Sequence, residues 1–444
     1  MDLSSPNGAS VNDGIQKELC SLQYVKVDEV VEAILTLGRG TELAKIDIKS
    51  AYRIVPVHPE DRPLLGMRWQ GKIYVDATLP FGLRSAPKIF NALADAAQWI
   101  IQEMGARYLW HYLDDFITIG AACQGECRFN CEVMRGACEV LGIPLAFEKC
   151  EGPTCCLVFL GIIIDTIAME LRLPQEKLLR LHQLIEEWLA KKPRASVKKR
   201  DLASLAGHLQ HACIIIRPGR TFLRRIFDLL ATIAHPDHYI RLSAGFRSDL
   251  MWWKLFLGEW NGISLMRAIG KQLADVSVFS DASGNWGCGA YSGSQWFQLP
   301  WTGKVVEQQI AVKELIPVVV AAVVWGKQWK GLDVKCHSDN QAVVAVMQTR
   351  TSRDPNIMHL LRCLSFIEAR FEFYLSAEYI PGSQNDLADD LSRNHLSSFL
   401  QKATRVSLKP TAIPQSLRDL LLVEKPDWLS QSWTHLFNNT LREV

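Results

Sequence analysis

Two adjacent aspartates, Asp114 and Asp115, interrupt an otherwise apolar segment, "RYLWHYLDDFITIG" (107–120). Aspartate is almost never buried without a partner, and two neighbouring like charges raise each other's cost of ionisation. The segment is therefore expected to form two strands joined at Asp114-Asp115, with both carboxylates at the tip of a hairpin. Paired carboxylates at such a tip can bind a divalent cation, which removes the repulsion between them.

A third acid with the same chemistry is expected from a neighbouring strand. The stretch "TELAKIDIKSAY" (41–52) is typical of a strand that ends near Asp47. Magnesium prefers oxygen ligands and keeps open positions for substrate phosphates. A "DD" pair alone is a common polar turn, but Asp47, Asp114-Asp115 and the intervening "LPFGLRSAP" (79–87) together form a much more specific pattern.

The length of 444 residues predicts two to four domains. A hairpin is expected around Gln70-Gly71, and the pattern from Pro174 to about Trp260 is helical, with strands returning after residue 270. A helix is expected over residues 85–105, and its buried face is predicted to comprise Ile89, Leu93, Ala96, Ala97 and Ile100.

Composition bears on whether the chain associates with a membrane and in which cellular compartment it is expected. No apolar run is long enough to span a bilayer, and the N-terminus lacks a signal-peptide pattern, so no membrane partner is expected. Twelve scattered cysteines favour a reduced, intracellular compartment, either cytoplasmic or nuclear. The basic stretch "KKPRASVKKR" (191–200) could neutralise nucleic-acid phosphates, and its alternative interpretation is a solvated charged face.

Three further clusters have simple structural interpretations. Cys123, Cys127 and Cys131 recur every four residues, which favours a core-facing helical stripe over a zinc site, because zinc prefers four ligands. The pair His208 and His211 favours phosphate contact or surface exposure over metal binding. Tryptophans 252, 253 and 260 could stack on bases, but core packing is favoured.

The acidic motifs resemble those of a known protein family. "YLDD" (112–115) resembles the signature tetrad of reverse transcriptases, and "AKIDIKSAY" (44–52) is similar to their first catalytic motif. "LPFGLRSAPKIF" (79–90) resembles the motif that cradles the incoming nucleotide and the template, and "FLG" (159–161) resembles the primer-grip hairpin. Together with "LSSPNGASVNDGI" (3–15), this wording looks most like retroelements of the DIRS type, which carry a tyrosine recombinase in place of an integrase.

The resemblance implies two-metal phosphoryl transfer between a primer 3′-hydroxyl and a deoxynucleoside triphosphate. It places Asp47 and Asp114 as metal ligands, with Asp115 as a further catalytic acid. Tyr52 matches the aromatic steric gate that rejects a 2′-hydroxyl, although strand-end packing is the alternative for this ring. Lys149 matches the lysine that protonates the leaving group.

The same resemblance implies a surface for substrate. Phe81 and Gly82 lie in the nucleotide-cradling motif and are expected to contact substrate. The implied partners are an RNA template, a DNA primer, an RNA–DNA hybrid and deoxynucleoside triphosphates. Three basic residues of the 191–200 stretch, Lys198, Lys199 and Arg200, are expected to grip the template–primer backbone without reading its sequence.

A second set of acids resembles ribonuclease H of retroelements. Its four members, in the order strand, helix, strand, helix, are Asp281, Glu314, Asp339 and Asp389. Each is implied to be catalytic and to bind metal for hydrolysis of the RNA strand of a hybrid. Asp390 is the alternative to Asp389. The family's mobile histidine has no match here, and Ser383 lies near its place.

The implied fold is α+β and multidomain: a right-hand polymerase palm and fingers with a helical thumb, then an RNase H-like α/β domain with a mixed sheet. The expected divisions are fingers and palm, thumb and connection, RNase H-like domain, and tail or linker, at 1–165, 166–270, 271–395 and 396–444. The implied cofactor is Mg²⁺ or Mn²⁺. A fingers strand that precedes "LSSPNG" in the family is expected to be missing, so a catalytically silent, nucleic-acid-binding remnant is the alternative function. An RNA-dependent RNA polymerase is disfavoured by Tyr52 and by the second set of acids.

Overall fold

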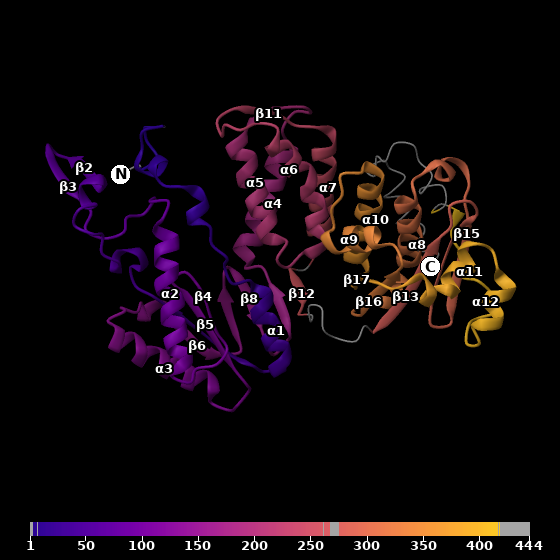
Figure 1. Cartoon of the computed structure of the whole chain (residues 1–444), viewed down its shortest axis with the longest axis horizontal. Helices are drawn as coiled ribbons and strands as arrows, with labels where there is room; N and C mark the ends of the chain where they lie inside the picture. Colours follow the sequence, from indigo (N-terminus) through magenta and orange to yellow (C-terminus); the bar gives the residue numbers. More distant parts are fainter. Residues whose placement is uncertain (1–2, 7, 261, 267–274, 416, 418–444) are drawn as a thin grey trace. The chain divides into compact units, whose positions relative to one another are not determined.

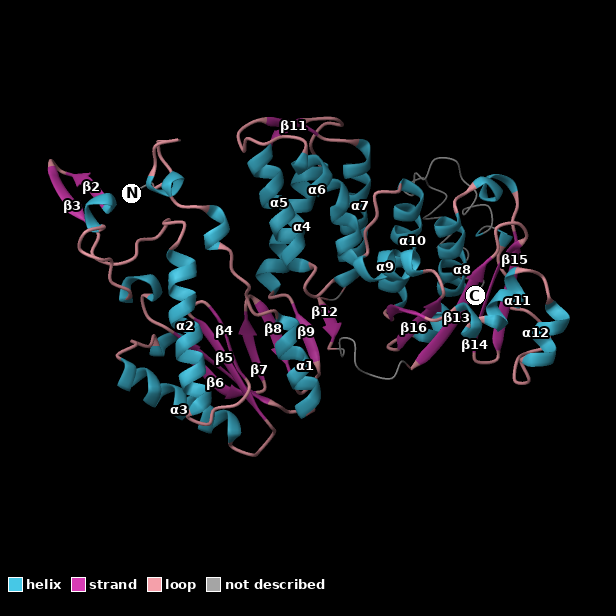
Figure 2. Ribbon diagram, viewed as in Figure 1, coloured by secondary structure: helices cyan, strands magenta, loops and turns pink. Residues whose placement is uncertain are grey.

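The computed structural model describes residues 3–6, 8–260, 262–266, 275–415 and 417 (Figure 1). The chain divides into two compact units. The first comprises Met1–Pro174 and Gly262–Lys271, and the second comprises Gln175–Asn261 and Gln272–Val444. Both units combine helices and sheets, so the predicted α+β class is confirmed (Figure 2). The finer division into four domains stays a prediction.

The first unit is built on a four-stranded antiparallel sheet in the order β4-β5-β1-β6. These strands are β4 (Leu109–Tyr112), β5 (Asp115–Gly120), β1 (Glu42–Asp47) and β6 (Glu151–Thr154). Side chains alternate between the faces of a strand, so one face of this sheet is free to pack on helices. Two of its helices, α2 (Ala86–Glu103) and α3 (Glu126–Leu141), share a hydrophobic core with the sheet.

The buried face of α2 differs from the predicted one. The buried residues follow Phe90, Ala94, Ala97 and Ile101, a helical spacing of three to four residues. Ile89 and Leu93, which were expected inside, are exposed. The face is therefore rotated by about one residue, because the helix carries apolar residues on two adjacent stripes.

Hairpins form where the turn residues predicted them. The strands β2 (Gly66–Trp69) and β3 (Lys72–Val75) are joined by Gln70 and Gly71, whose φ angles of 49° and 77° suit a tight two-residue turn. A second hairpin joins β7 (Cys156–Phe159) to β8 (Ile162–Asp165). The sheet around it continues through β9 (Glu170–Arg172) and β12 (Ile263–Leu265).

The second unit begins with a group of helices. They are α4 (Gln175–Leu189), α5 (Lys199–Ala212), α6 (Arg224–Ala231) and α7 (Ala244–Glu259). Trp252 and Trp253 are buried, and the Trp252 ring stacks on Phe222 with centroids 3.9 Å apart. Core packing is therefore the observed role of these two tryptophans. A short ribbon of β10 (Ser196–Lys198) and β11 (Tyr239–Arg241) is paired alongside.

The rest of this unit contains a five-stranded sheet in the order β15-β14-β13-β16-β17. The sheet is mixed, as predicted. The strands are β13 (Val276–Ala282), β14 (Gly287–Ser292), β15 (Gln295–Pro300), β16 (Asp333–Ser338) and β17 (Tyr374–Tyr379). β13, β14 and β15 are antiparallel, whereas β13, β16 and β17 are parallel. The accompanying helices are α8 (Ile310–Trp325), α9 (Gln341–Thr349), α10 (Pro355–Phe371), α11 (Asp386–Ser392) and α12 (Leu396–Lys402).

The start of the stretch 396–444, which was predicted to be a tail or linker, packs onto this sheet. Phe399 of α12 is fully buried in a cluster with Trp296 and Leu391. The indole N–H of Trp296 donates to the carbonyl of Ser407 at 2.7 Å. The described part of that stretch therefore belongs to the second unit, and residues 418–444 lie outside the described residues.

Candidate active sites

The first group of acids lies at one edge of the sheet in the first unit. Asp47 is the last residue of β1 and lies directly opposite Asp115, the first residue of β5. Tyr112 pairs with Asp115, so the turn between β4 and β5 is Leu113-Asp114, one residue earlier than predicted. Leu113 has a φ of 54°, an uncommon value for a leucine, which sets Asp114 at the tip.

Two lysines neutralise part of this acidic group. The Lys149 ammonium lies 3.2 Å from Asp47 Oδ1, and the Lys45 ammonium lies 3.1 Å from Asp115 Oδ1. Burial, followed by the charges of Asp115 and Asp47, raises the pKa of Asp114 above its usual value. The group thus carries unbalanced negative charge at Asp114, which a bound cation would relieve.

Tyr52 borders the same acids. Its ring packs between Phe81 and Phe90, with centroid distances of 5.5 and 5.6 Å. Burial, Tyr24 and then Asp114 raise the pKa of the Tyr52 phenol, which places the ring near Asp114. Phe81 is exposed, so it remains available to a ligand. The structure is therefore compatible with both alternatives for Tyr52, because its ring packs against Phe90 and also lies beside Asp114.

The turn that carries Gly82 is held by a residue that sequence reasoning missed. The side chain of Asn12 is buried and donates to the carbonyl of Gly82 at 2.9 Å. Its amide oxygen accepts the backbone N–H of Arg84 at 2.7 Å. Gly82 has a φ of 87°, in the region that favours glycine. The sequence analysis assigned no role to Asn12, and this contact spans 70 residues.

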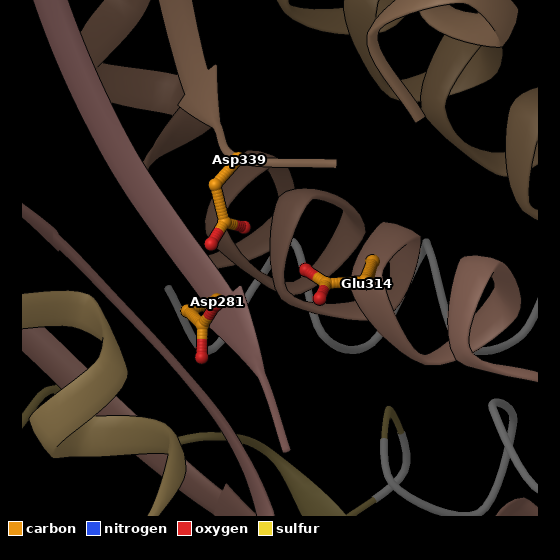
Figure 3. A group of neighbouring side chains, drawn as sticks. All are labelled: Asp281, Glu314 and Asp339. Carbon is orange, nitrogen blue, oxygen red and sulfur yellow. The ribbon is translucent and has the colours of Figure 1, made fainter. Parts of the chain in front are cut away.

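Three acids of the second group converge in the second unit (Figure 3). Asp281 lies near the end of β13, Asp339 directly follows β16, and Glu314 is the fifth residue of α8. β13 and β16 are parallel neighbours, so their carboxyl ends meet at one edge, and α8 presents Glu314 there. One ligand atom from each residue lies within 4.8 Å of the others. We call these residues the acid triad.

Electrostatics within the acid triad favour a cation. Burial, followed by the charges of Asp281 and Asp339, raises the pKa of Glu314 to about 9. Burial also raises the pKa of Asp281 to about 6. Oε2 of Glu314 is buried and accepts no hydrogen bond from the described residues. Three oxygen donors in mutual repulsion fit a hard divalent cation such as Mg²⁺.

The fourth predicted acid lies beside the acid triad. Asp389 is close enough to raise the pKa values of Asp281 and Glu314, and it pairs with Arg393 at 2.6 Å. Asp390 instead accepts from Lys402 at 2.7 Å and from Ser398 at 2.8 Å, both on α12. The geometry therefore directs Asp389, and not Asp390, towards the acid triad.

Two residues for which no role was predicted, Asn385 and Gly382, lie close to the acid triad. The side-chain amide of Asn385 is buried and donates to the carbonyl of Ser280 at 3.0 Å, which ties the start of α11 to β13. A Cβ on Gly382 would lie 3.1 Å from Oδ2 of Asp339, so the loop approaches this acid closely. The predicted Ser383 lies in the same short turn, Gly382–Gln384.

The predicted basic residues Lys198, Lys199 and Arg200 already have partners within the protein. The Lys199 ammonium donates to the carbonyls of Ile233 and Ala234, the latter at 3.2 Å. Arg200 pairs with Asp237 at 2.9 Å, and Lys198 approaches the same carboxylate at 3.8 Å. Lys198 and Arg200 can therefore exchange their partner for a phosphate more readily than Lys199 can.

The cysteine stripe lies in the core. Cys127, Cys131 and Cys138 of α3 are buried among apolar residues, whereas Cys123 precedes the helix and is exposed. Across the described ranges, the acid triad is the one group of three histidine, cysteine or acidic side chains spaced to bind a metal. Zinc binding by these cysteines is therefore not supported by their placement.

Comparison with known proteins finds a family match within the first unit. Residues 8–164 match the family model described as reverse transcriptase (RNA-dependent DNA polymerase). These residues form a reverse transcriptase domain. The match spans β1, β4 and β5, and thus includes Asp47, Asp114 and Asp115.

Two curated relatives of this chain are polyproteins. The enzymatic polyprotein of Cestrum yellow leaf curling virus is 22% identical over 403 residues, which covers 82% of this chain and 56% of the relative. The retrovirus-related Pol polyprotein from transposon gypsy of Drosophila melanogaster is 22% identical over 379 residues, covering 82% of this chain and 34% of the relative. The chain thus spans about half the length of the first relative and a third of the second.

Solved structures with a similar arrangement include foamy viral protease–reverse transcriptases. One in complex with double-stranded DNA has a TM-score of 0.45 and 15% identity, covering 81% of this chain and 60% of the other. Another in complex with an RNA/DNA hybrid has a TM-score of 0.43 and 16% identity, covering 81% and 46%. Among the described helices of this chain, none combines the length and apolarity that a membrane crossing requires.

Proposed function

We propose that this chain is an RNA-directed DNA polymerase with RNase H activity, encoded by a retrotransposon of the DIRS type. The observation that carries this proposal is the acid triad, which lies on a mixed sheet in the second unit of a chain whose first unit contains a reverse transcriptase domain. The relationship to the gypsy Pol polyprotein supports a retroelement origin. Its ligands would be an RNA template, a DNA primer, an RNA–DNA hybrid and deoxynucleoside triphosphates.

In the polymerase reaction, Asp47 and Asp114 would hold magnesium, with Asp115 beside them. Bound magnesium would supply charge neutralisation for the triphosphate and a lower pKa for the primer hydroxyl. Lys149 would then be released from Asp47 and would be free to donate a proton to the leaving pyrophosphate. The Tyr52 ring, held by Phe90, would close the space that a 2′-hydroxyl needs.

In the hydrolysis of RNA, the acid triad and Asp389 would hold the metal ions. Glu314 keeps its proton at neutral pH in the metal-free protein, because its pKa is about 9. Metal binding requires the carboxylate form, so binding would release that proton. Asp281 and Asp339, fixed at the ends of two parallel strands, would orient the site relative to the RNA phosphate.

A catalytically silent, nucleic-acid-binding remnant is the second candidate function. The observation that favours it is the pairing of Asp47 and Asp115 with the ammonium groups of Lys149 and Lys45. Such pairs stabilise the acids without a metal. In a remnant they would be the permanent state of the site.

Primer extension and hybrid cleavage, measured on the same preparation of the full chain, test both candidates. Asp114→Asn should abolish magnesium-dependent DNA synthesis and spare cleavage of RNA in a hybrid, because the two acid groups lie in separate units. Asp61→Asn, at an exposed position of the first unit, is the matched control. If the parent shows neither activity, the remnant is supported. If Asp114→Asn extends primers like the parent, the assignment of Asp114 is wrong.

A further inference from the structure

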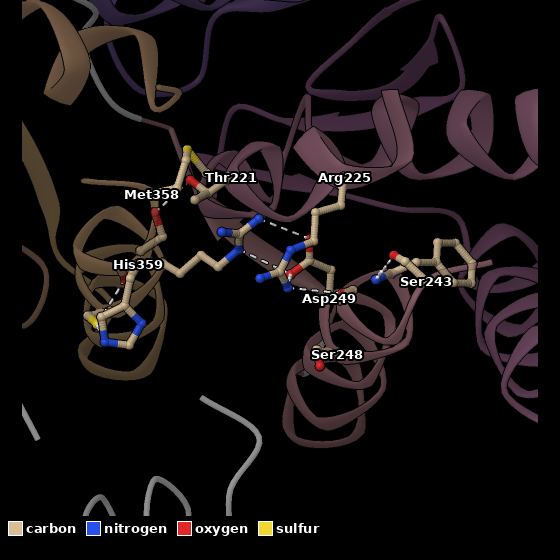
Figure 4. A network of polar contacts seen from close by, with 12 residues as sticks. Thr221, Arg225, Ser243, Ser248, Asp249, Met358 and His359 are labelled. Atoms are coloured by element: carbon tan, nitrogen blue, oxygen red, sulfur yellow. Dashed lines mark hydrogen bonds and ion pairs between the residues drawn. The ribbon is translucent and has the colours of Figure 1, made fainter. Parts of the chain in front are cut away.

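A polar cavity of about 270 Å³ lies within the second unit and is lined by residues of α6 and of the first turns of α10. Figure 4 shows the polar contacts of Arg225 and Asp249 in this region. It is separate from the acid triad, and none of the predicted site residues line it. Four arginines line the cavity: Arg224, Arg225, Arg353 and Arg362. Such a concentration of guanidinium groups around one cavity is unusual for a structural core, because positive charges repel each other.

At the buried end of the cavity, which we call its floor, two arginines pair with one carboxylate. Asp249 is fully buried and accepts from Nε and Nη2 of Arg362 at 3.1 and 3.2 Å. The same carboxylate accepts from Nη1 of Arg225 at 3.0 Å. Arg362 is itself only 4% exposed. One negative charge therefore serves two positive charges, and the floor keeps an excess of one.

The exposed side of the cavity, which we call its rim, adds the positive charge of Arg353. Arg224 pairs with Asp228 at 2.9 Å, whereas Arg353 is exposed and has no carboxylate partner among the described residues. His359 adds no charge, because burial, Arg362 and Arg225 lower its pKa to about 4. Four guanidinium groups face the carboxylates of Asp228 and Asp249 and of Asp354 at the start of α10, which leaves a net positive charge. The N-terminal end of α10 is capped by the Asp354 carboxylate, which accepts the backbone N–H groups of Asn356 and Ile357.

We propose that this cavity is a phosphate-binding site. Its net positive charge favours a phosphate anion, and guanidinium groups bind phosphate oxygens through paired N–H donors. The volume would hold roughly nine waters at about 30 Å³ each, so a phosphate group fits with space for bridging water. Arg362, fixed by Asp249, would supply a rigid donor, and the exposed Arg353 would close over the ligand.

The position of the cavity favours a phosphate of the nucleic-acid backbone. The N-cap residue of α8, Gln309, donates to Asp354 at 2.5 Å, and Asn356 donates to Gln308 at 2.9 Å. These bonds join the start of α10 to the start of α8. Glu314 follows Gln309 by five residues, on the order of 7 to 8 Å along the helix axis. A strand bound at the acid triad could therefore pass the cavity, an assignment that rests on the proposed function.

The test compares Arg353→Gln with the parent chain, using Arg405→Gln as a control. Both arginines are exposed and lie in the second unit, and Arg405 is not part of the cavity. All binding is measured in EDTA, so that the acid triad cannot attract phosphate through a metal. Calorimetric titration with inorganic phosphate reports on the cavity, and fluorescence anisotropy with an RNA–DNA hybrid at several salt concentrations reports on backbone contacts.

We expect Arg353→Gln to weaken phosphate binding roughly tenfold or more and to reduce the log–log salt slope of hybrid binding by roughly 0.7 to 0.9. Arg405→Gln should leave both values unchanged. Loss of phosphate binding with an unchanged hybrid slope supports the site but assigns it to a small free phosphate compound. Unchanged phosphate binding in Arg353→Gln overturns the proposal.

Failure of the proposed function would look different. A parent chain that cleaves no hybrid would contradict the RNase H assignment, while the phosphate titration in EDTA would still report on the cavity. Arg353→Glu provides a second variant, because charge reversal at this exposed position should abolish phosphate binding without disturbing the buried Asp249 pairs. Equal melting temperatures of the variants and the parent would establish that folding is intact.

Discussion

Glu314 allows the energetics of the acid triad to be tested directly. Its side chain is buried, and burial together with Asp281 and Asp339 raises its pKa from 4.5 to about 9. Between these two values the folded protein keeps a proton that the unfolded chain has released. The stability linked to this proton is complete below pH 4.5 and is lost progressively as the pH rises towards 9.

The size of the effect follows from the same two values. At pH 7 the loss extends over about 2.5 pH units at about 1.4 kcal/mol each, which gives about 3 kcal/mol. Glu314→Gln keeps the size of the side chain and can accept the hydrogen bond from the backbone of Ala282, but it cannot ionise. We therefore expect the variant to be more stable than the parent at pH 7 without metal, by up to about 3 kcal/mol, and equally stable near pH 4.

Amide hydrogen exchange of α8 is the appropriate assay, because it reports on the second unit alone. Exchange is measured in EDTA at pH 5, 7 and 8.5 and corrected for the intrinsic rate at each pH. Glu187→Gln, an exposed glutamate of α4, is the matched control and should follow the parent. The variant should also lose hybrid cleavage. Equal pH dependence of α8 protection in the parent and in Glu314→Gln would refute the reasoning.

Four further substitutions test other parts of the molecule. Tyr52→Val should raise the ratio of ribonucleotide to deoxynucleotide incorporation, and an unchanged ratio in primer extension would leave only packing against Phe90. Arg200→Ala should shallow the salt dependence of template–primer binding by roughly 0.7 to 0.9, whereas Lys199→Ala should lower the melting temperature, because its ammonium satisfies two carbonyls. Arg362→Met should destabilise the second unit by about 3 to 5 kcal/mol in urea unfolding, since it removes one partner of a buried ion pair. A loss below about 1 kcal/mol would mean that Arg225 alone is enough to neutralise Asp249.

Local signals in the sequence predicted hairpins well and their register less well. Gln70-Gly71 was placed correctly because both residues adopt the positive φ angles of a two-residue turn. The turn at the paired aspartates was placed one residue late. Its actual position depends on the pairing of Asp115 with Tyr112 and with Asp47, which is 68 residues away in the sequence.

The orientation of α2 shows the same limit. The sequence carries two adjacent apolar stripes, one through Ile89 and Leu93 and the other through Phe90 and Ala94. Periodicity alone cannot choose between stripes that differ by one residue, or about 100° around the helix. The choice is made by tertiary packing, in which Phe90 contacts the ring of Tyr52 at 5.6 Å.

The order of the acids along the chain predicted which strands and helices carry them, but not their ionic partners. Lys45 and Lys149 lie 70 and 102 residues from the aspartates they neutralise, and the motif that contains Lys45 predicted no role for it. Asn12 likewise reaches Gly82 across 70 residues. Such contacts depend on the assembled sheet, and a single sequence carries no local pattern for them.

The two acid groups solve the same electrostatic problem in different ways. In the first unit, lysine ammonium groups neutralise Asp47 and Asp115, so a metal ion must compete with positive side chains. In the second unit, Glu314 is neutralised by a proton, so a metal ion must compete with protons up to about pH 9. Competition with a lysine that is 60% exposed weakens little with pH but is screened by salt, whereas competition with a proton eases as the pH rises. The two proposed metal sites would therefore bind metal best under different conditions of salt and pH.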